Sequence, residues 1–82
     1  MDEPEARHEY RLVCREPTGL VFAKFLRFDD GSGFVHVDGL VTWFELDQTT
    51  WRRKWNDLLS RGFVEVEQAV IQGLVSADEL PT

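Results

Sequence analysis

Cysteine and long apolar runs are both scarce in this chain, and each scarcity excludes a class of protein. The 82 residues include one cysteine, Cys14, so no internal disulfide can form, and a free thiol is typical of a reducing compartment. No apolar run approaches the ~20 residues that a membrane-spanning helix needs. The first residues, from Met1 to Ala6, are acidic and lack the basic start and apolar stretch of a secretory signal. These absences predict a cytoplasmic protein with no membrane partner.

Basic residues are also in deficit. Nine Lys and Arg stand against 15 Asp and Glu, and the net charge of -6 argues against a generally basic nucleic-acid-binding surface. The composition is otherwise that of a folded chain, 43% hydrophobic with three Trp and six Phe. The length predicts one domain. We place it at residues 9–75, after a flexible acidic tail (1–8) and before a polar C-terminal tail (76–82).

The clearest element is a helix between Asp47 and Gly62. Its apolar residues recur at helical spacing on one face: Trp51, Trp55, Leu58 and Leu59. Asp47 or Thr49 can cap its N-terminus, and Gly62 suits a left-handed cap at its C-terminus. Two tryptophans on one face require a broad apolar surface to pack against.

Alternating apolar residues predict strands on both sides of this helix. Four strands at 9–15, 20–28, 34–37 and 40–46 precede it, joined by turns at 16–19, 29–33 and 38–39. A fifth strand, at 63–67, follows it. Residues 68–75 fit either a helix or a strand, and their β-branched content together with the lack of a turn after Glu67 favours a strand as far as about Gln72. The predicted fold class is α+β: an antiparallel β-meander of about four strands, one amphipathic helix on one face, and a C-terminal fifth strand at an edge (order ββββαβ).

The turns also predict which side chains share a face of the sheet. They pair Arg15 with Leu20, Phe28 with Phe34 and Val37 with Leu40, and paired residues lie on the same face. The first face, here called the apolar face, carries Tyr10, Leu12, Cys14, Val21, Ala23, Phe25, Val35, Val37, Leu40, Phe44 and Leu46. The second, here called the mixed face, carries Arg11, Val13, Arg15, Leu20, Phe22, Lys24, Leu26, Phe28, Phe34, His36, Val41, Trp43 and Glu45. The helix is expected to cover the apolar face.

The mixed face is the candidate binding surface, because large apolar groups on it also need a cover. That cover could be the chain's own C-terminal segment, a second copy, another protein or a ligand with stacking rings. The candidate interface residues are Phe22, Phe28, Phe34, His36, Trp43, Arg11, Arg15 and Lys24. The leading interpretation is a non-enzymatic protein–protein interaction module that forms a homodimer through this face. The alternative is a single-stranded nucleic-acid binder, in which bases stack on the aromatic rings and the cations contact phosphates.

No cofactor, metal site or catalytic residue is predicted. The loop at 29–33 resembles part of a calcium or phosphate loop but lacks the spaced oxygens or following helix of either. Cys14 and His36 could form a nucleophile pair, yet they fall on opposite faces of the predicted sheet. Glu65 and Glu67, on one side of the fifth strand and with Glu45 near, could carry out acid–base chemistry, although acids on an edge strand more often keep that edge soluble. The chain is therefore not expected to be an enzyme.

Overall fold

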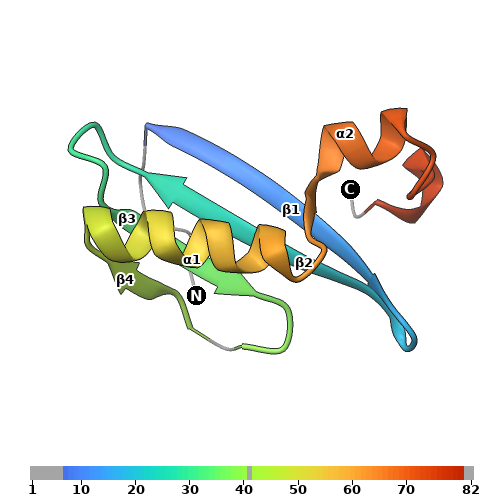
Figure 1. Cartoon of the computed structure of the whole chain (residues 1–82), viewed down its shortest axis with the longest axis horizontal. Helices are drawn as coiled ribbons and strands as arrows, with labels where there is room; N and C mark the ends of the chain where they lie inside the picture. The colour runs from blue at the N-terminus through green and yellow to red at the C-terminus, as the bar shows by residue number, and fades with distance from the viewer. Residues whose placement is uncertain (1–6, 41, 81–82) are drawn as a thin grey trace.

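The computed structural model, described over residues 7–40 and 42–80, has a five-stranded antiparallel sheet in the order β4-β3-β2-β1-β5 (Figure 1). The elements are β1 (His8–Glu16), β2 (Gly19–Arg27), β3 (Gly33–Val37), β4 (Phe44–Leu46), α1 (Gln48–Ser60), β5 (Val64–Glu65), α2 (Val66–Ile71) and a 3₁₀ helix, η1 (Ala77–Glu79). The α+β class, the four-strand meander and the edge position of the fifth strand are confirmed. The predicted acidic tail lies mostly outside the described residues, although β1 already begins at His8.

Both predicted ends of α1 are confirmed. The Asp47 carboxylate accepts a hydrogen bond from the Thr50 N–H at 2.7 Å, which satisfies one of the free amides of the first turn. At the other end, Gly62 has φ +100, and the Phe63 N–H donates to the Leu58 carbonyl at 3.1 Å, so the helix ends in a Schellman motif. Leu59, at the margin of the predicted apolar stripe, is exposed and lies outside the core.

The two tryptophans of α1 are the centre of the main core, on the apolar face. The indole rings of Trp51 and Trp55 stack at 5.5 Å, and each meets Tyr10 and Phe25 edge to face. The Trp51 indole N–H donates to the Leu26 carbonyl at 2.9 Å. The buried residues of this cluster are Leu12, Ala23, Phe25, Val35, Leu46, Trp51, Leu58 and Phe63.

Two predicted strand pairings were wrong by two residues. Phe34 pairs with Leu26 rather than Phe28, because the hairpin closes through three residues, 29–31, with Gly31 at φ +89. The Asp38–Gly39 turn does form, but Asp38 stays bound to Phe22 of β2 through its amide (2.9 Å) and its carboxylate (2.8 Å). The chain therefore begins to pair with β3 later than predicted, and the fourth strand covers Phe44–Leu46 rather than 40–46.

These shifts leave the predicted faces intact. A shift of two residues keeps each side chain on its own side of the sheet, because side chains alternate with a period of two. The Arg15–Leu20 pair forms as predicted, and Val35 pairs with Phe44 on the apolar face. Val41, assigned to the mixed face, lies outside the described residues.

The prediction of a strand as far as Gln72 was wrong. β5 pairs only with Leu12 and Val13 of β1, and the chain then enters α2. Helical spacing lets Val66 and Ala69 turn toward the mixed face, where they form a second buried cluster with Val13 and Val75. Residues 76–80, predicted as a polar tail, continue this layer, and Leu80 packs against the cluster.

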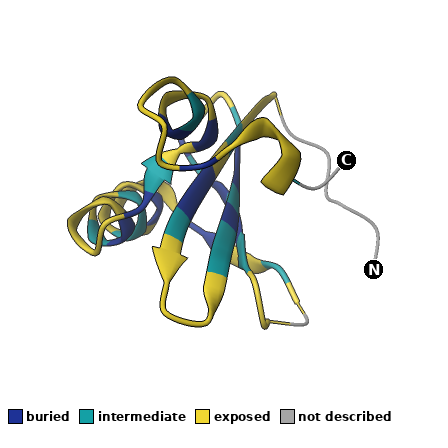
Figure 2. Ribbon diagram, turned by 90° about the vertical axis from the view of Figure 1, so that its right-hand side faces the viewer, coloured by how far each residue is buried: buried dark blue, intermediate teal, exposed yellow. Residues whose placement is uncertain are grey.

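The sheet thus lies between two layers. Figure 2 shows α1 on one side of the strands and the end of the C-terminal segment (residues 66–80), with η1, on the other, while α2 lies against β1 and β5 at the edge of the sheet. Among the described residues no helix has the length and apolar character needed to cross a membrane.

Candidate functional site

The C-terminal segment covers one end of the mixed face and holds one of the predicted site residues. One guanidinium nitrogen of Arg15 donates to the Leu74 carbonyl at 3.0 Å and to the two Glu79 carboxylate oxygens at 3.0 and 3.1 Å. Glu79 also accepts from the Ser76 amide at 2.9 Å. The Ser76 hydrogen bond and then Arg15 lower the pKa of Glu79, since both favour its charged form. Arg15 therefore anchors the chain's own C-terminal segment.

Four of the predicted residues, Arg11, Phe22, Lys24 and His36, line one pocket on the rest of the mixed face, with a volume of about 360 Å³. Carboxylates line the same pocket. Glu9 lies 3.4 Å from the Lys24 ammonium, and Asp38 sits opposite on the β3 side. Positive and negative groups are therefore interleaved here, and the pocket does not present the uniformly cationic surface that a polyanion prefers.

The remaining predicted aromatic residues pack against one another. The rings of Phe28 and Phe34 meet edge to face with centroids 5.9 Å apart, and His36 lies 5.3 Å from Trp43. A His36 ring nitrogen is 2.8 Å from the Leu40 carbonyl oxygen, which ties the mixed face to the connection between β3 and β4. All four rings are half-buried. The predicted stacking platform is thus largely occupied by its own contacts.

A groove that the sequence reasoning missed lies on the apolar face, beside β4. Its floor is Val35 and Val37 of β3, and Leu40 and Phe44 stand along its outer side. Glu45 and Leu46 of β4 also line it, together with Thr50 and Lys54 of α1, and its volume is about 350 Å³. We call this the α1–β4 groove. Phe44 and Leu40 are 49% and 43% exposed, whereas the large apolar side chains of the mixed face that the structure describes are at least half-buried.

α1 leaves part of the apolar face uncovered, at Leu40 and Phe44. Neighbouring strands lie about 4.8 Å apart, and a helix with its side chains is about 10–12 Å wide, so one helix covers two or three strands. The predicted apolar face extends over four strands, with Leu40 and Phe44 at its far edge. α1 crosses the strands and covers Leu12, Phe25 and Val35 of β1, β2 and β3 (Figure 1). It also lies against β4, where Leu46 is buried, whereas Leu40 and Phe44 stay exposed.

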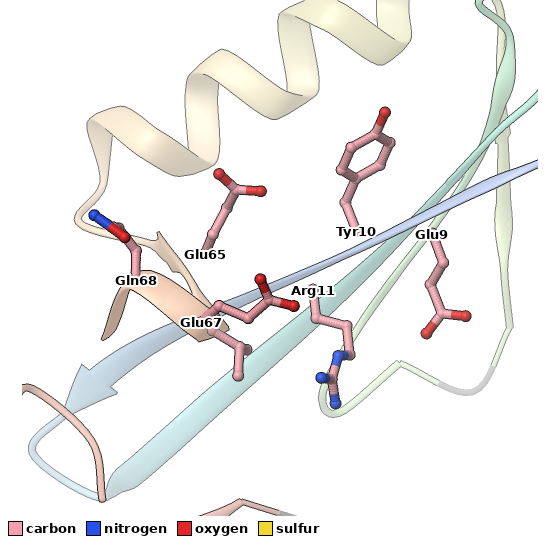
Figure 3. Close-up of a pocket in the computed structure, with 7 residues that line it drawn as sticks. Glu9, Tyr10, Arg11, Glu65, Glu67 and Gln68 are labelled. Carbon is pink, nitrogen blue, oxygen red and sulfur yellow. The ribbon is translucent and has the colours of Figure 1, made fainter. Parts of the chain in front are cut away.

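The opposite edge of the sheet carries an acidic pocket of about 330 Å³, next to β1 and the start of α2 (Figure 3). Glu65 lies on the α1 side of β1, and Glu9 and Arg11 lie on the other side. β5 ends at Glu65, so Glu67 belongs to α2 rather than to one side of a fifth strand as predicted. Glu45 is on β4, at the other edge of the sheet, so the three carboxylates do not form one group.

The cysteine and histidine side chains do not form a catalytic or metal site in the described part of the chain. Cys14 pairs with Val21 on the apolar face and His36 points to the mixed face, so the conceivable nucleophile pair is separated by the sheet. Burial and the nearby Glu16 raise the pKa of the Cys14 thiol, which disfavours the reactive thiolate. Within residues 7–40 and 42–80, no three His, Cys, Asp or Glu side chains lie close enough together to hold a metal ion.

Comparison with family models, with curated proteins and with solved structures finds no match, so the α1–β4 groove and the pocket of the mixed face are interpreted from their own geometry.

Proposed function

We propose that this chain is a small non-enzymatic protein–protein interaction module that binds its partner in the α1–β4 groove. One observation carries the proposal: Phe44 and Leu40, each more than two-fifths exposed, border an apolar groove at an open edge of the sheet. Large apolar side chains gathered beside a cavity are typical of surfaces that another protein covers. We place the module in the cytoplasm, where its single thiol stays reduced.

The edge position of β4 supports this proposal. β4 pairs with β3 on one side only, so the backbone groups on its other side face outward. Such an edge can accept a strand from another chain, and pockets beside it then select the side chains of that strand. An apolar anchor in the groove would bury Phe44 and Leu40 together. Edge and groove therefore form one docking surface.

The docking surface in this proposal differs from the mixed face, which the sequence favours for a homodimer. The C-terminal segment already supplies part of the cover that the mixed face needs, through Val66, Ala69 and Val75. The α1–β4 groove has no such cover among the described residues. A second copy of the chain is kept as one outcome of the tests.

The second candidate function is binding of single-stranded nucleic acid. Its support is that Arg11, Lys24 and His36 converge beside Phe22 in one pocket. Against it stand Glu9 and Asp38 in the same pocket, and the use of Arg15 by the C-terminal segment. We therefore rank it below the protein-binding function.

The test is affinity capture from a lysate of cells that produce the chain, with and without nuclease treatment. The baits are the native chain, Phe44→Glu, and the matched control Ile71→Glu, which changes a residue that is 77% exposed on α2. We expect protein partners that survive nuclease, bind the native and Ile71→Glu baits, and are lost with Phe44→Glu. Partners retained by Phe44→Glu would contradict the proposed surface. Capture of RNA or DNA that is lost with Arg11→Ala would favour the second candidate.

A further inference from the structure

We infer that the pocket of the mixed face binds a small zwitterion about the size of a dipeptide, with its carboxylate on Arg11 and its ammonium group on Asp38. This pocket lies on the other side of the sheet from the α1–β4 groove, so the inference goes beyond the proposed function and does not depend on it. Two charged groups of opposite sign, and the apolar surface between them, carry the inference.

Arg11 is the cation of the pocket that the described residues leave without a partner. The β1–β2 register sets it directly opposite Lys24, and two like charges in such a cross-strand pair destabilise each other. Glu9 lies 3.4 Å from the Lys24 ammonium, whereas the Arg11 guanidinium forms no ion pair or hydrogen bond with any residue in 7–40 or 42–80. A ligand carboxylate that accepts two hydrogen bonds from this guanidinium would weaken the repulsion.

Asp38 supplies the opposite charge at the β3 side of the pocket. One oxygen of its carboxylate accepts from the Phe22 amide at 2.8 Å, and the carboxylate forms no ion pair within the described part of the chain. The hydrogen bond fixes the carboxylate beside β2 and leaves its second oxygen for a ligand. An ammonium group carries three donors and a positive charge, so it suits this acceptor.

The balance of charge in the pocket selects a zwitterion over a simple ion. A ligand with only negative charge would meet Glu9 and Asp38, and a ligand with only positive charge would meet Arg11 and Lys24. A ligand with both charges can place each one beside a group of opposite sign, which offsets the cost of removing it from water. Both sides of the pocket therefore attract such a ligand.

The distance across the sheet sets the length of the ligand. Arg11 is on β1 and Asp38 follows β3, so two strand spacings of about 4.8 Å each separate their backbones. An α-amino acid carries both charges on one carbon, whereas a dipeptide holds them several bonds apart. Phe22 and Leu80 are large apolar residues of the pocket, and its volume of about 360 Å³ suits a small molecule. A dipeptide with an apolar side chain therefore fits both the charges and the surface.

The test is a titration of the isotope-labelled native chain with free dipeptides, followed through its amide chemical shifts. The dipeptides are added as pools that together contain every pair of the standard amino acids. We expect at least one pool to shift amides of residues 9–11, 22–24 and 36–38. The dipeptide that binds best is then remade with its amino end acetylated or its carboxyl end amidated, and each block should weaken binding about tenfold or more.

Two variants that remove one charge each locate the ligand. Arg11→Gln and Asp38→Asn should each weaken binding of that dipeptide about tenfold or more, because each removes one charged partner. Asparagine keeps an oxygen for the Phe22 amide, so the second substitution should preserve the fold. The matched controls Arg53→Gln and Asp57→Asn change charges on α1, on the other side of the sheet, and should leave binding unchanged.

The other outcomes overturn the inference. No shift at these amides with any pool would remove the site. A blocked dipeptide that binds as tightly as the free one would show that one charge suffices. Shifts at the same amides with single-stranded oligothymidylate, and none with dipeptides, would favour the second candidate function. Phe44→Glu should bind the dipeptide like the native chain, so the groove and this pocket are tested independently.

Discussion

The two faces of the sheet are covered in different ways. On the apolar face, the 13-residue α1 builds a cluster of eight buried residues in which aromatic rings contact each other from three elements. On the mixed face, Val66 and Ala69 of the six-residue α2 form a cluster of four with Val13 and Val75, and the exposed Arg15–Glu79 pair fastens the C-terminal segment. The layer on the apolar face is thus held by packed aromatic rings. The layer on the mixed face is held by small aliphatic side chains and one exposed ion pair. We expect the two layers to differ in stability, and that difference can be tested.

Substitution of Trp51 should give the largest loss of stability, because the core of the apolar face packs around this side chain. It is 5% exposed, stacks on Trp55 and donates to the Leu26 carbonyl. We expect Trp51→Ala to lower the free energy of unfolding by ~3–5 kcal/mol. Trp51→Phe keeps a ring but leaves the Leu26 carbonyl without its donor, and should cost about 1–3 kcal/mol. Urea unfolding followed by circular dichroism measures both. A loss below about 1 kcal/mol for Trp51→Ala would contradict the central place of this residue.

Val75 tests whether the layer on the mixed face opens separately. It is buried between α2 and Val13, and Val75→Ala should cost about 1–2 kcal/mol. Because the second cluster is small, we expect this loss to appear as local opening of residues 66–80 while α1 stays protected. Amide hydrogen exchange resolves the two layers. Equal loss of protection in α1 would show instead that the two layers unfold as one unit.

Lowering the pH should destabilise the C-terminal segment, because Glu79 becomes protonated. Its lowered pKa means that the charged carboxylate stabilises the fold above the ordinary Glu value of 4.5, and that this stabilisation is lost as the pH falls through the lowered folded-state pKa. We expect amides of residues 74–80 to lose protection between about pH 6 and pH 3, with α1 changing less. Glu79→Gln should remove most of this pH dependence. An unchanged pH profile in that variant would assign the effect to other carboxylates.

Phe44→Glu should have the smallest effect on folding, although we expect it to abolish binding. Phe44 is 49% exposed and is not one of the buried core residues, so the free energy of unfolding should change by only about 0.5 kcal/mol. Thermal unfolding monitored beside the capture experiment checks both statements. A large drop in stability would mean that Phe44 belongs to the core, and loss of binding would then not locate the docking surface.

The sequence predicts the apolar side of this molecule well, because its signals there are local. Trp51, Trp55 and Leu58 recur at helical spacing, and Asp47 and Gly62 mark the ends of the helix. The faces of the sheet could also be assigned, since an error of two residues in a hairpin preserves the alternation of side chains.

The C-terminal layer and the groove were not predicted because they depend on tertiary packing. Val66 and Ala69 are equally compatible with a strand, and only their contacts with Val13 and Val75 select the helix. The extra length of the β3–β4 connection follows from hydrogen bonds between Asp38 and β2, which no local sequence pattern predicts. The groove depends on which side chains α1 covers, since Leu46 of β4 is buried and Phe44 of the same strand is exposed, and that requires the placement of the helix on the sheet.

Photo-crosslinking in the native cells tests most directly where the partner binds. p-Benzoylphenylalanine is placed in separate experiments at Phe44 in the groove, at Phe28 on the mixed face and at Ile71 on α2. We predict that irradiation links one partner protein to position 44 and not to positions 28 or 71. Crosslinks from position 28 in the absence of any from position 44 would contradict the account and return the binding surface to the mixed face.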